Sequence, residues 1–429
     1  SKTTAIGKDA LGVQNFTTAT DSLNTAVGYL AGGAVTTGTE NTLIGGLAGD
    51  SLSVGNKNIA IGYRTLSADT KGNKNVAVGN FALSTQNFTT ATDSFNVGVG
   101  HGAGEGITTG LNNTLIGSLA GDALTDADNN VALGYQSLST NTIGSKSTAL
   151  GSFALFNQNP ATAVDMFNTA VGYDAGNGVT TGILNTLVGG LAGDGLTTGS
   201  RNVAFGKDAL TADTLGSRST AIGFATLYSQ NFTTATDAYN VAVGEQAGLT
   251  LTTGTGNTLI GGLAGDSLTD ADRNIAIGYL ALPADTLGSR SIAIGIGALE
   301  VQNFTSATNT YNIAIGYDTG NSIENGVKNT IIGGLAGETI TTGDYNVIVG
   351  YSNQSAAVGT DTQIIIGQSV TGVGANNFTF GNGATDSNIA FGATSITAPS
   401  DQRYKEEIAD ATAGLAFIKD LRPVTFKWK

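Results

Sequence analysis

Short apolar segments that end in glycine recur along the chain. The first five are TAIG, TAVG, TLIG, IAIG and VAVG, and their marker glycines are Gly7, Gly28, Gly45, Gly62 and Gly79. Thr, Val and Ile dominate these segments, which favours strands because β-branched side chains lose χ1 freedom in a helix. In IAIG, the two isoleucines (Ile59 and Ile61) point to one side, whereas the alanine and the glycine point to the other. Neither side is charged, so the pattern predicts strands that are covered on both faces.

The marker glycines follow a fixed spacing. Steps of 21, 17, 17 and 17 residues separate the first five, and this 72-residue scheme continues to Gly367. Self-similarity at a fixed period predicts a solenoid in which each repeat forms one coil. About 21 coils at ~4.8 Å each would form a rod roughly 100 Å long. A coil this thin buries little core by itself, and its Ala/Gly side suits close approach of another backbone, so we expect identical chains to associate around an axis.

The longer coil of each unit carries a second recurring stretch. QNFTTATDSLN (14–24) returns with small changes at 86–96, 158–168, 230–240 and 302–312. The four additional residues predict a bulge at one angular position, in a row of five copies. The bulge contains Phe16, Phe88, Phe232 and Phe304, and its end carries Leu23, Phe95, Phe167, Tyr239 and Tyr311. Two interpretations remain open for these rings: a receptor-facing row, or packing inside the longer coil.

Composition and charge exclude several classes of protein. The 63 glycines of the 429 residues follow no three-residue period and there are only 4 prolines, which excludes collagen. The net charge of −14, with no basic cluster before residue 400, gives no support for binding to nucleic acid or to an anionic membrane surface. The chain lacks cysteine, which excludes disulfides and thiolate metal sites. No apolar segment approaches the ~18 residues of a membrane span, and the first residues suggest a fragment of a longer protein.

Single residues that could act in catalysis or bind a metal give only weak signals. His101 is the only histidine, and we interpret it as a loop residue. Aspartates in the AGD and TDAD turns offer oxygen ligands, but they form no complete calcium-binding motif, so we interpret them as turn residues. They are Asp50, Asp122, Asp126, Asp128, Asp194, Asp266, Asp270 and Asp272. The sequence therefore predicts no bound metal and no cofactor.

The context of the marker glycines resembles a known family. NTAVGYLAG (24–32), NIAIGYRTL (58–66) and SIAIGIGAL (291–299) are similar to the head repeats of trimeric autotransporter adhesins. The resemblance covers roughly residues 4–367, although the coils here are longer than is usual in that family. It implies a homotrimer of left-handed parallel β-rolls. Phage fibres use similar repeats, so the resemblance leaves the biological system open.

The composition changes near Pro399. SDQRYKEEIADATAGLAFIKDLRPVTFKWK (400–429) resembles the beginning of the intramolecular chaperone and self-cleaving peptidase domain of phage tail spikes and tail fibres, including endosialidases. The matching residues are Ser400, Asp401, Arg403, Lys405, Ile408, Leu415, Ile418, Leu421, Pro423 and Trp428. Independently of the family, Asp410 is a suitable cap for a short α-helix that Pro423 ends.

The second resemblance implies an autocatalytic site. The cleaved bond would be Pro399–Ser400, with Ser400 as the nucleophile and Lys405 as the base. Lys405 would then have to be neutral, and the nearby charge of Arg403 favours that state. Read without the family, Ser400 is a helix cap and Lys405 is a solvated charge. We expect a repetitive β-roll in residues 1–350, an irregular β region in 351–399, and the start of the chaperone domain in 400–429.

These features predict an all-β protein with a function in adhesion. We expect the distal homotrimeric tail fibre of a phage or phage-like injection particle, located on the virion tail or the particle surface. Its partners would be a host cell-surface receptor (glycan or protein) and other tail or baseplate proteins at the N-terminal side. The alternatives are a bacterial surface adhesin and, less favoured, a polysaccharide-degrading tail spike, because no carboxylate pair interrupts the repeats to build a cleft. Activity on an external substrate, nucleic-acid binding and membrane insertion are not expected.

Overall fold

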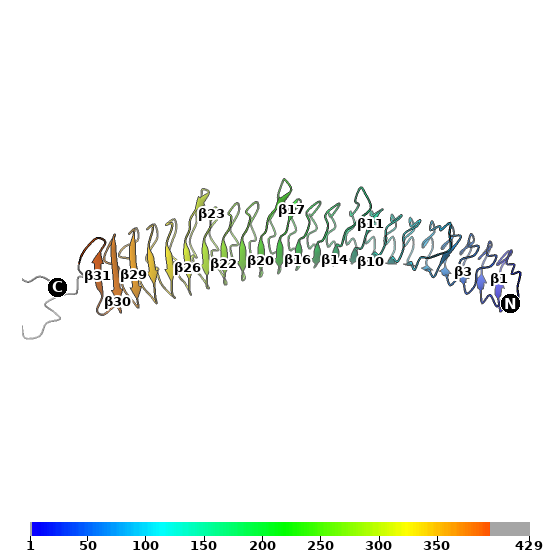
Figure 1. The fold of residues 1–429 in the computed structure, drawn as a ribbon, viewed down its shortest axis with the longest axis horizontal. Helices are drawn as coiled ribbons and strands as arrows, with labels where there is room; N and C mark the ends of the chain where they lie inside the picture. Colours follow the sequence, from blue (N-terminus) through cyan, green and yellow to red (C-terminus); the bar gives the residue numbers. More distant parts are fainter. Residues whose placement is uncertain (1, 395–429) are drawn as a thin grey trace, which may run out of the picture.

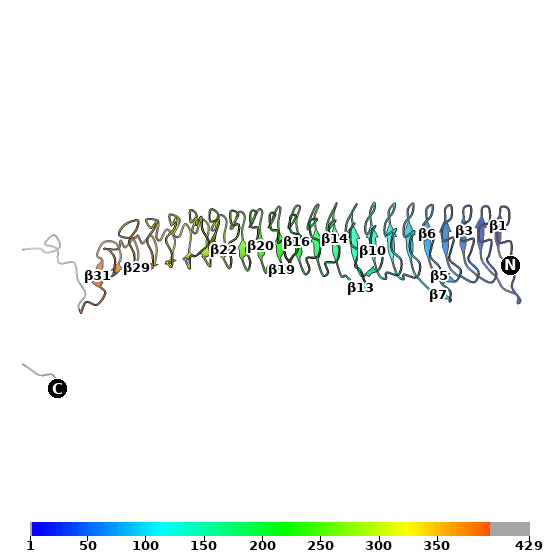
Figure 2. The ribbon, with the colours of Figure 1, turned by 90° about the horizontal axis from the view of Figure 1, so that it is seen from above.

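The chain forms an elongated and gently curved rod of stacked coils (Figure 1, Figure 2). The computed structural model describes residues 2–394. About 22 turns of about 17 residues stack along the rod, and each contributes one short strand that lies across the long axis. Residues 2–394 contain no helix. In this part of the chain, then, no helix is available to cross a membrane.

The main sheet takes one strand from each coil and follows the order of the chain. Its strands are β1 (Thr4–Ile6), β2 (Thr25–Val27), β3 (Thr42–Ile44), β4 (Ile59–Ile61), β6 (Val76–Val78), β8 (Val97–Val99), β9 (Thr114–Ile116), β10 (Val131–Leu133), β12 (Thr148–Leu150), β14 (Thr169–Val171), β15 (Thr186–Val188), β16 (Val203–Phe205), β18 (Thr220–Ile222), β20 (Val241–Val243), β21 (Thr258–Ile260), β22 (Ile275–Ile277), β24 (Ile292–Ile294), β26 (Ile313–Ile315), β27 (Thr330–Ile332), β28 (Val347–Val349), β29 (Gln363–Gly367), β30 (Asn377–Gly381) and β31 (Ser387–Ala390). The predicted marker segments are therefore strands, and the prediction of a parallel β-solenoid is confirmed.

Neighbouring strands are parallel and in register. Thr4 pairs with Thr25, and Ala5 pairs with Ala26. Equivalent positions of successive coils therefore form straight columns along the rod. Parallel stacking continues beyond residue 350 through β29 and β30, and only β31, which is antiparallel to β30, reverses the direction.

The interior of each coil is narrow and is filled by small and aliphatic side chains. Ala60 and Leu66 are fully buried there and belong to one continuous hydrophobic core. Ile59 and Ile61 point outward and are 39% and 36% exposed. The predicted alternation is confirmed, and the structure adds that the alanine side faces the interior of the coil.

The marker glycines allow neighbouring coils to approach closely. A Cβ atom on Gly62, whose φ is +139°, would lie 2.7 Å from the carbonyl oxygen of Gly79 in the next coil. L-residues avoid this backbone conformation, and the space is already occupied. The neighbouring backbone is the adjacent coil of the same chain, so the expectation that the Ala/Gly side meets another chain is wrong.

The longer coils project from the rod and carry an additional strand pair. The pairs are β5 (Gly72–Asn73) with β7 (Thr92–Asp93), β11 (Gly144–Ser145) with β13 (Val164–Asp165), β17 (Gly216–Ser217) with β19 (Thr236–Asp237), and β23 (Gly288–Ser289) with β25 (Thr308–Asn309). The loops at β11, β17 and β23 project from the same side of the rod (Figure 1). This arrangement confirms a row of bulges at one angular position.

Buried asparagines four residues before the marker glycines join successive coils. The backbone N–H of Asn41 donates to Oδ1 of Asn24 over 2.8 Å, and its side-chain Nδ2 donates to the Gly55 carbonyl oxygen over 2.8 Å. The same bonds recur at Asn58, Asn113 and many later coils. We call this column the asparagine ladder. Because each side chain bonds a carbonyl oxygen and an N–H group of the next coil, the ladder fixes the register of neighbouring coils.

Candidate functional site

The predicted autocatalytic residues lie outside the described part of the chain. Pro399, Ser400, Arg403, Lys405 and the helix expected after Asp410 all belong to residues 395–429, of which the structure describes nothing. The cleavage at Pro399–Ser400 therefore stays a prediction.

The phenylalanines predicted for the bulge point into it. Phe88, Phe232 and Phe304 are only 6%, 5% and 7% exposed, and Phe16 in the first copy is half-buried. Rings that are almost fully buried have little surface left for a receptor. Their burial favours the second interpretation, packing inside the longer coil, over a receptor-facing row.

A buried polar network explains why QN recurs with the bulge. Gln86 donates from Nε2 to Oδ2 of Asp69 over 2.6 Å, and its Oε1 accepts a bond from Nδ2 of Asn96 over 2.9 Å. Oδ1 of Asp69 also accepts the backbone N–H groups of Gly72 (2.9 Å) and Phe88 (3.3 Å). Burial raises the pKa of Asp69, while these hydrogen bonds act in the opposite direction.

The network returns in the later copies with one informative change. Asp213 with Gln230 and Asp285 with Gln302 repeat the 2.6 Å bond. In the third copy, Asn141 takes the place of the aspartate, and Nε2 of Gln158 keeps only the bond to Oγ of Ser147 that Gln230 and Gln302 also make to their serines. Sequence reasoning missed this network. The available signal was that QN is present in all five copies of the stretch, whereas the ring is replaced by Pro160 in the third.

A column of lysines, arginines and rings precedes the strands. We call it the pre-strand column and define it as the residue five positions before each marker glycine. Nine of the 13 lysines and arginines in residues 2–394 lie in it: Lys2, Lys57, Lys74, Lys146, Arg201, Arg218, Arg273, Arg290 and Lys328. It also holds the exposed residues Leu23, Phe95, Phe167, Tyr239, Tyr311 and Tyr345. The second set of rings predicted at the bulge is therefore on the surface.

Within this column, each ring lies beside a cation of the preceding coil. Lys74 Nζ lies 4.9 Å from the ring centroid of Phe95. The guanidinium carbon of Arg218 lies 5.3 Å from the ring centroid of Tyr239. Acidic side chains adjoin several of these cations, for example Asp93, which lies 2.6 Å from Lys74. The column is thus ordered by cation–π contacts and ion pairs, and much of its charge is neutralised.

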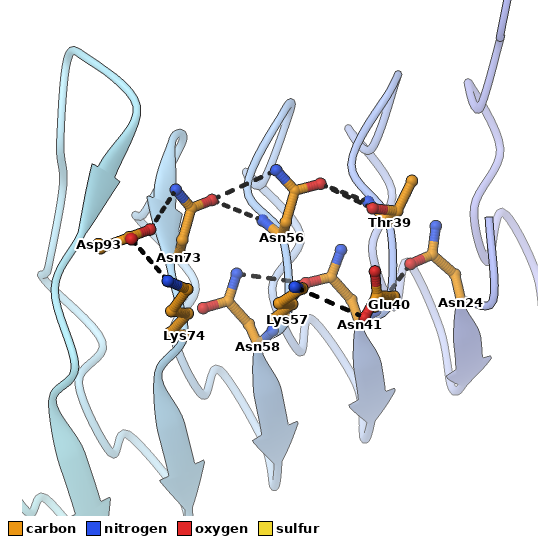
Figure 3. Close-up of polar contacts among 10 residues, drawn as sticks. All are labelled: Asn24, Thr39, Glu40, Asn41, Asn56, Lys57, Asn58, Asn73, Lys74 and Asp93. Carbon is orange, nitrogen blue, oxygen red and sulfur yellow. Dashed lines mark hydrogen bonds and ion pairs between the residues drawn. The ribbon is translucent and has the colours of Figure 1, made fainter. Parts of the chain in front are cut away.

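A shallow trough of about 340 Å³ follows the first part of the pre-strand column. Figure 3 shows the residues that line it. Lys57, Lys74, Glu40 and Asp93 contribute its charged groups. The remaining lining residues are Thr39, Asn56 and Asn73. Asn56 Oδ1 accepts the Thr39 N–H over 2.8 Å, and Asn73 Oδ1 accepts the Asn56 N–H over 2.8 Å. Most polar groups of the trough already hydrogen-bond to the neighbouring coil, so the trough can offer a ligand only weak contacts.

Rings also follow the strands. We define the post-strand column as the first and second residues after each marker glycine. Its aromatic members are Tyr29, Tyr63, Phe81, His101, Tyr135, Phe153, Tyr173, Phe224, Tyr279, Tyr317 and Tyr351. Tyr63 and Phe81 stack edge to face with centroids 5.7 Å apart, and the His101 ring lies 6.1 Å from Phe81. The loop position predicted for His101 is therefore part of an aromatic edge.

Between these two edges lies an apolar column, the residue directly before each marker glycine. It consists of Val, Ile, Leu or Phe in every coil from Ile6 to Phe380. None of its members is buried in the described chain. Ile6, Leu133 and Phe205 are exposed to 60%, 48% and 55%.

The AGD turns do not assemble a recognisable ion site. Oδ1 of Asp50, Asp194 and Asp266 is buried without a hydrogen-bond partner. Burial, with the nearby carboxylate of Asp174, raises the pKa of Asp194 to about 6. In residues 2–394, no group of three or more His, Cys, Asp or Glu side chains is placed to share one ion. Asp50, Asp194 and Asp266 are best described as turn residues whose pKa is raised by burial.

The geometry defines a fibre-like parallel β-solenoid with an unpartnered apolar column. Comparison with known families adds that residues 400–429 match the family described as chaperone of endosialidase. No curated protein matches the chain. Chaperone domains of this family are typical of phage tail fibres and tail spikes.

Proposed function

We propose that this protein is a homotrimeric tail-fibre component of a phage or phage-like injection particle, and that it contacts a host cell-surface receptor. The apolar column carries the proposal. It runs along about 22 coils, roughly 100 Å at ~4.8 Å per coil, and a single chain leaves it uncovered. A continuous apolar surface of this length is typical of an interface between chains.

Three copies are supported by the family relationships. The marker repeats resemble trimeric adhesin heads, and chaperone domains of the matched family act in trimeric fibres. Three sheets closed around a common axis would cover all three apolar columns at once. The coil, which is too thin to supply much core alone, would then gain a second core on its outer face.

Adhesion would be multivalent. The bulge tips carry exposed polar residues, for example Thr89 and Thr90, and recur every four coils, ~19 Å apart. Three chains would therefore present many weak contacts in a fixed geometry. Such an array gains affinity from effective concentration without any single strong site.

Processing is the second part of the proposal and rests on the resemblance of residues 400–429. Ser400 Oγ would attack the carbonyl carbon of Pro399, with Lys405 accepting the hydroxyl proton. The bond to the Ser400 nitrogen breaks, and water then hydrolyses the ester to release the carboxylate of Pro399. The chaperone domain would leave the fibre after it has assisted folding.

The experiment is a mass measurement on a chain that includes the whole C-terminal domain, first native and then denatured. We expect a native trimer whose denatured chain ends at Pro399. S400A should abolish the cut, and the nearby control S395A should not. The pair I277D/I294D in the apolar column should dissociate the trimer, whereas T181D on an exposed turn should leave it intact. A native monomer would refute the trimer, and an uncut trimer would refute only the processing step.

A further inference from the structure

The pre-strand column and the post-strand column form the two edges of the apolar column, and they differ in chemistry. The pre-strand column collects cations and rings, and the post-strand column collects mainly rings. Both are exposed: Tyr63 to 47% and Phe95 to 48%. Because a strand separates the columns, one chain cannot bring its own two edges together at the same coil.

Symmetry determines which groups can meet if three copies close around an axis, so the inference rests on the proposed trimer. Each copy then forms one wall of a triangular prism, and each corner joins the pre-strand edge of one copy to the post-strand edge of the next. A threefold axis along the rod moves no chain lengthwise. The side chains that meet therefore belong to the same coil.

The residues at equal levels are complementary in the first repeat. On three successive coils the pre-strand column holds Lys57, Lys74 and Phe95, and the post-strand column holds Tyr63, Phe81 and His101. The latter three rings already stack on each other and form a continuous aromatic edge. Two lysines would thus face two rings, and Phe95 would face the imidazole of His101. Ring faces attract cations, and Lys74 would then lie between Phe95 of its own chain and Phe81 of the neighbour.

The same correspondence holds at three levels of the later repeats but not at Arg201, whose level holds Lys207, nor at Lys328, whose level holds Gly334 and Leu335. Lys146 shares its level with Phe153, which stacks on Tyr135 with centroids 5.3 Å apart. Arg218 shares its level with Phe224, and Arg273 shares its level with Tyr279. Where the pre-strand column has Gly256, the first residue of the post-strand column is Gly262, so both edges are narrower at this level.

We propose that neighbouring copies join in register along these edges, with the pre-strand cations of one copy placed against the post-strand rings of the next. The apolar column supplies burial that is nearly uniform along the rod, so it tolerates a lengthwise shift of one chain. The edges vary along the rod, so a lengthwise shift changes which side chains meet. They also make each contact heterologous, which three copies close into a ring.

The test uses thiols at one level and at two levels. The protein has no cysteine, so only introduced thiols react. In K57C/Y63C, the two thiols of one chain lie six residues apart on an extended segment, ~20 Å, beyond a short bis-maleimide. Thiols of neighbouring copies would lie within its reach. We expect a covalent closed trimer on a denaturing gel.

The control is K57C/Y135C, which uses the equivalent ring one repeat away, ~19 Å along the rod. It should give little cross-linked product. Cross-linking of the control but not of the first pair, or equal cross-linking of both, would overturn the register. A native trimer with no cross-link in either variant would place the edges apart and overturn this inference alone. A native monomer would refute the proposed trimer, and the inference with it.

Discussion

The asparagine ladder offers a direct test of how the coils are held together. The perturbation is Asn113→Ala, in the middle of the second repeat. Asn113 Oδ1 accepts the N–H of Asn130 over 3.0 Å, and Asn113 Nδ2 donates to the carbonyl oxygen of Ala127 over 2.8 Å. Both partners are backbone groups in the buried interior of the coil. Truncation of the side chain therefore leaves one donor and one acceptor without this partner.

The magnitude follows from these two groups. Leaving a buried donor or acceptor unsatisfied costs about 1–3 kcal/mol, so the two together cost about 2–6 kcal/mol. At 1.4 kcal/mol per tenfold, local opening of this coil should become roughly 30- to 20,000-fold more frequent. Asn113→Ser should cost less than alanine, because serine occupies the equivalent positions Ser147, Ser219 and Ser291.

Hydrogen exchange of the Asn130 amide measures this opening directly. We expect faster exchange at Asn130 and its neighbours in N113A, an intermediate rate in N113S, and no change in S118A, which alters the opposite edge of the same coil. The reasoning is refuted if the Asn130 amide exchanges at the same rate in N113A as in the unmodified protein. An equal increase in S118A would point to general loosening of the fold.

Two further predictions concern the aspartate network and the marker glycines. Burial raises the folded pKa of Asp69, Asp213 and Asp285 above 3.8, so the stability that these carboxyls contribute is complete below that pH and is lost as the pH rises through the folded pKa. The triple substitution D69N/D213N/D285N places asparagine where the third copy already has Asn141. It should raise the melting temperature at pH 7 and change it little at pH 4. A decrease of the melting temperature at pH 7 would contradict this prediction. G117A places a Cβ 2.4 Å from the Gly134 carbonyl oxygen and should lower the melting temperature sharply, whereas in G46A the nearest atom is 3.6 Å away and the melting temperature should hardly change. Similar losses in both variants would show that the close approach is not what requires glycine.

The sequence predicts the coils because their determinants are local. Strand residues, marker glycine and spacing all lie within a few residues of one another, so IAIG at 59–62 identifies a strand and its turn without any knowledge of the rest. The position of the bulge follows in the same way from four additional residues. The register also follows, since identical units stacked at a fixed period place equivalent residues in columns.

Features that depend on the cross-section of the coil are not predictable from spacing. Alternation separates Ala60 from Ile61, but only the narrow interior decides that the alanine faces inward. The partner of Gln86 is Asp69, 17 residues earlier, and nothing in either local sequence marks the pair. From the sequence alone, the Phe232 side chain could equally lie on the outside or on the inside of a loop of this length. The backbone of Lys74, with φ of +61°, is another example, because left-handed geometry is uncommon for lysine.

The direction of the hydrogen bonds has a mechanical consequence. Strands lie across the rod, so the bonds of the main sheet run along its length (Figure 1). Tension on the fibre would load the coils in series, and each coil resists with only its own few bonds and its ladder side chain. A released coil of about 17 residues adds roughly 56–61 Å of chain. Under increasing force the rod should therefore lengthen in discrete increments of whole coils, so that each released coil limits the load on the rest.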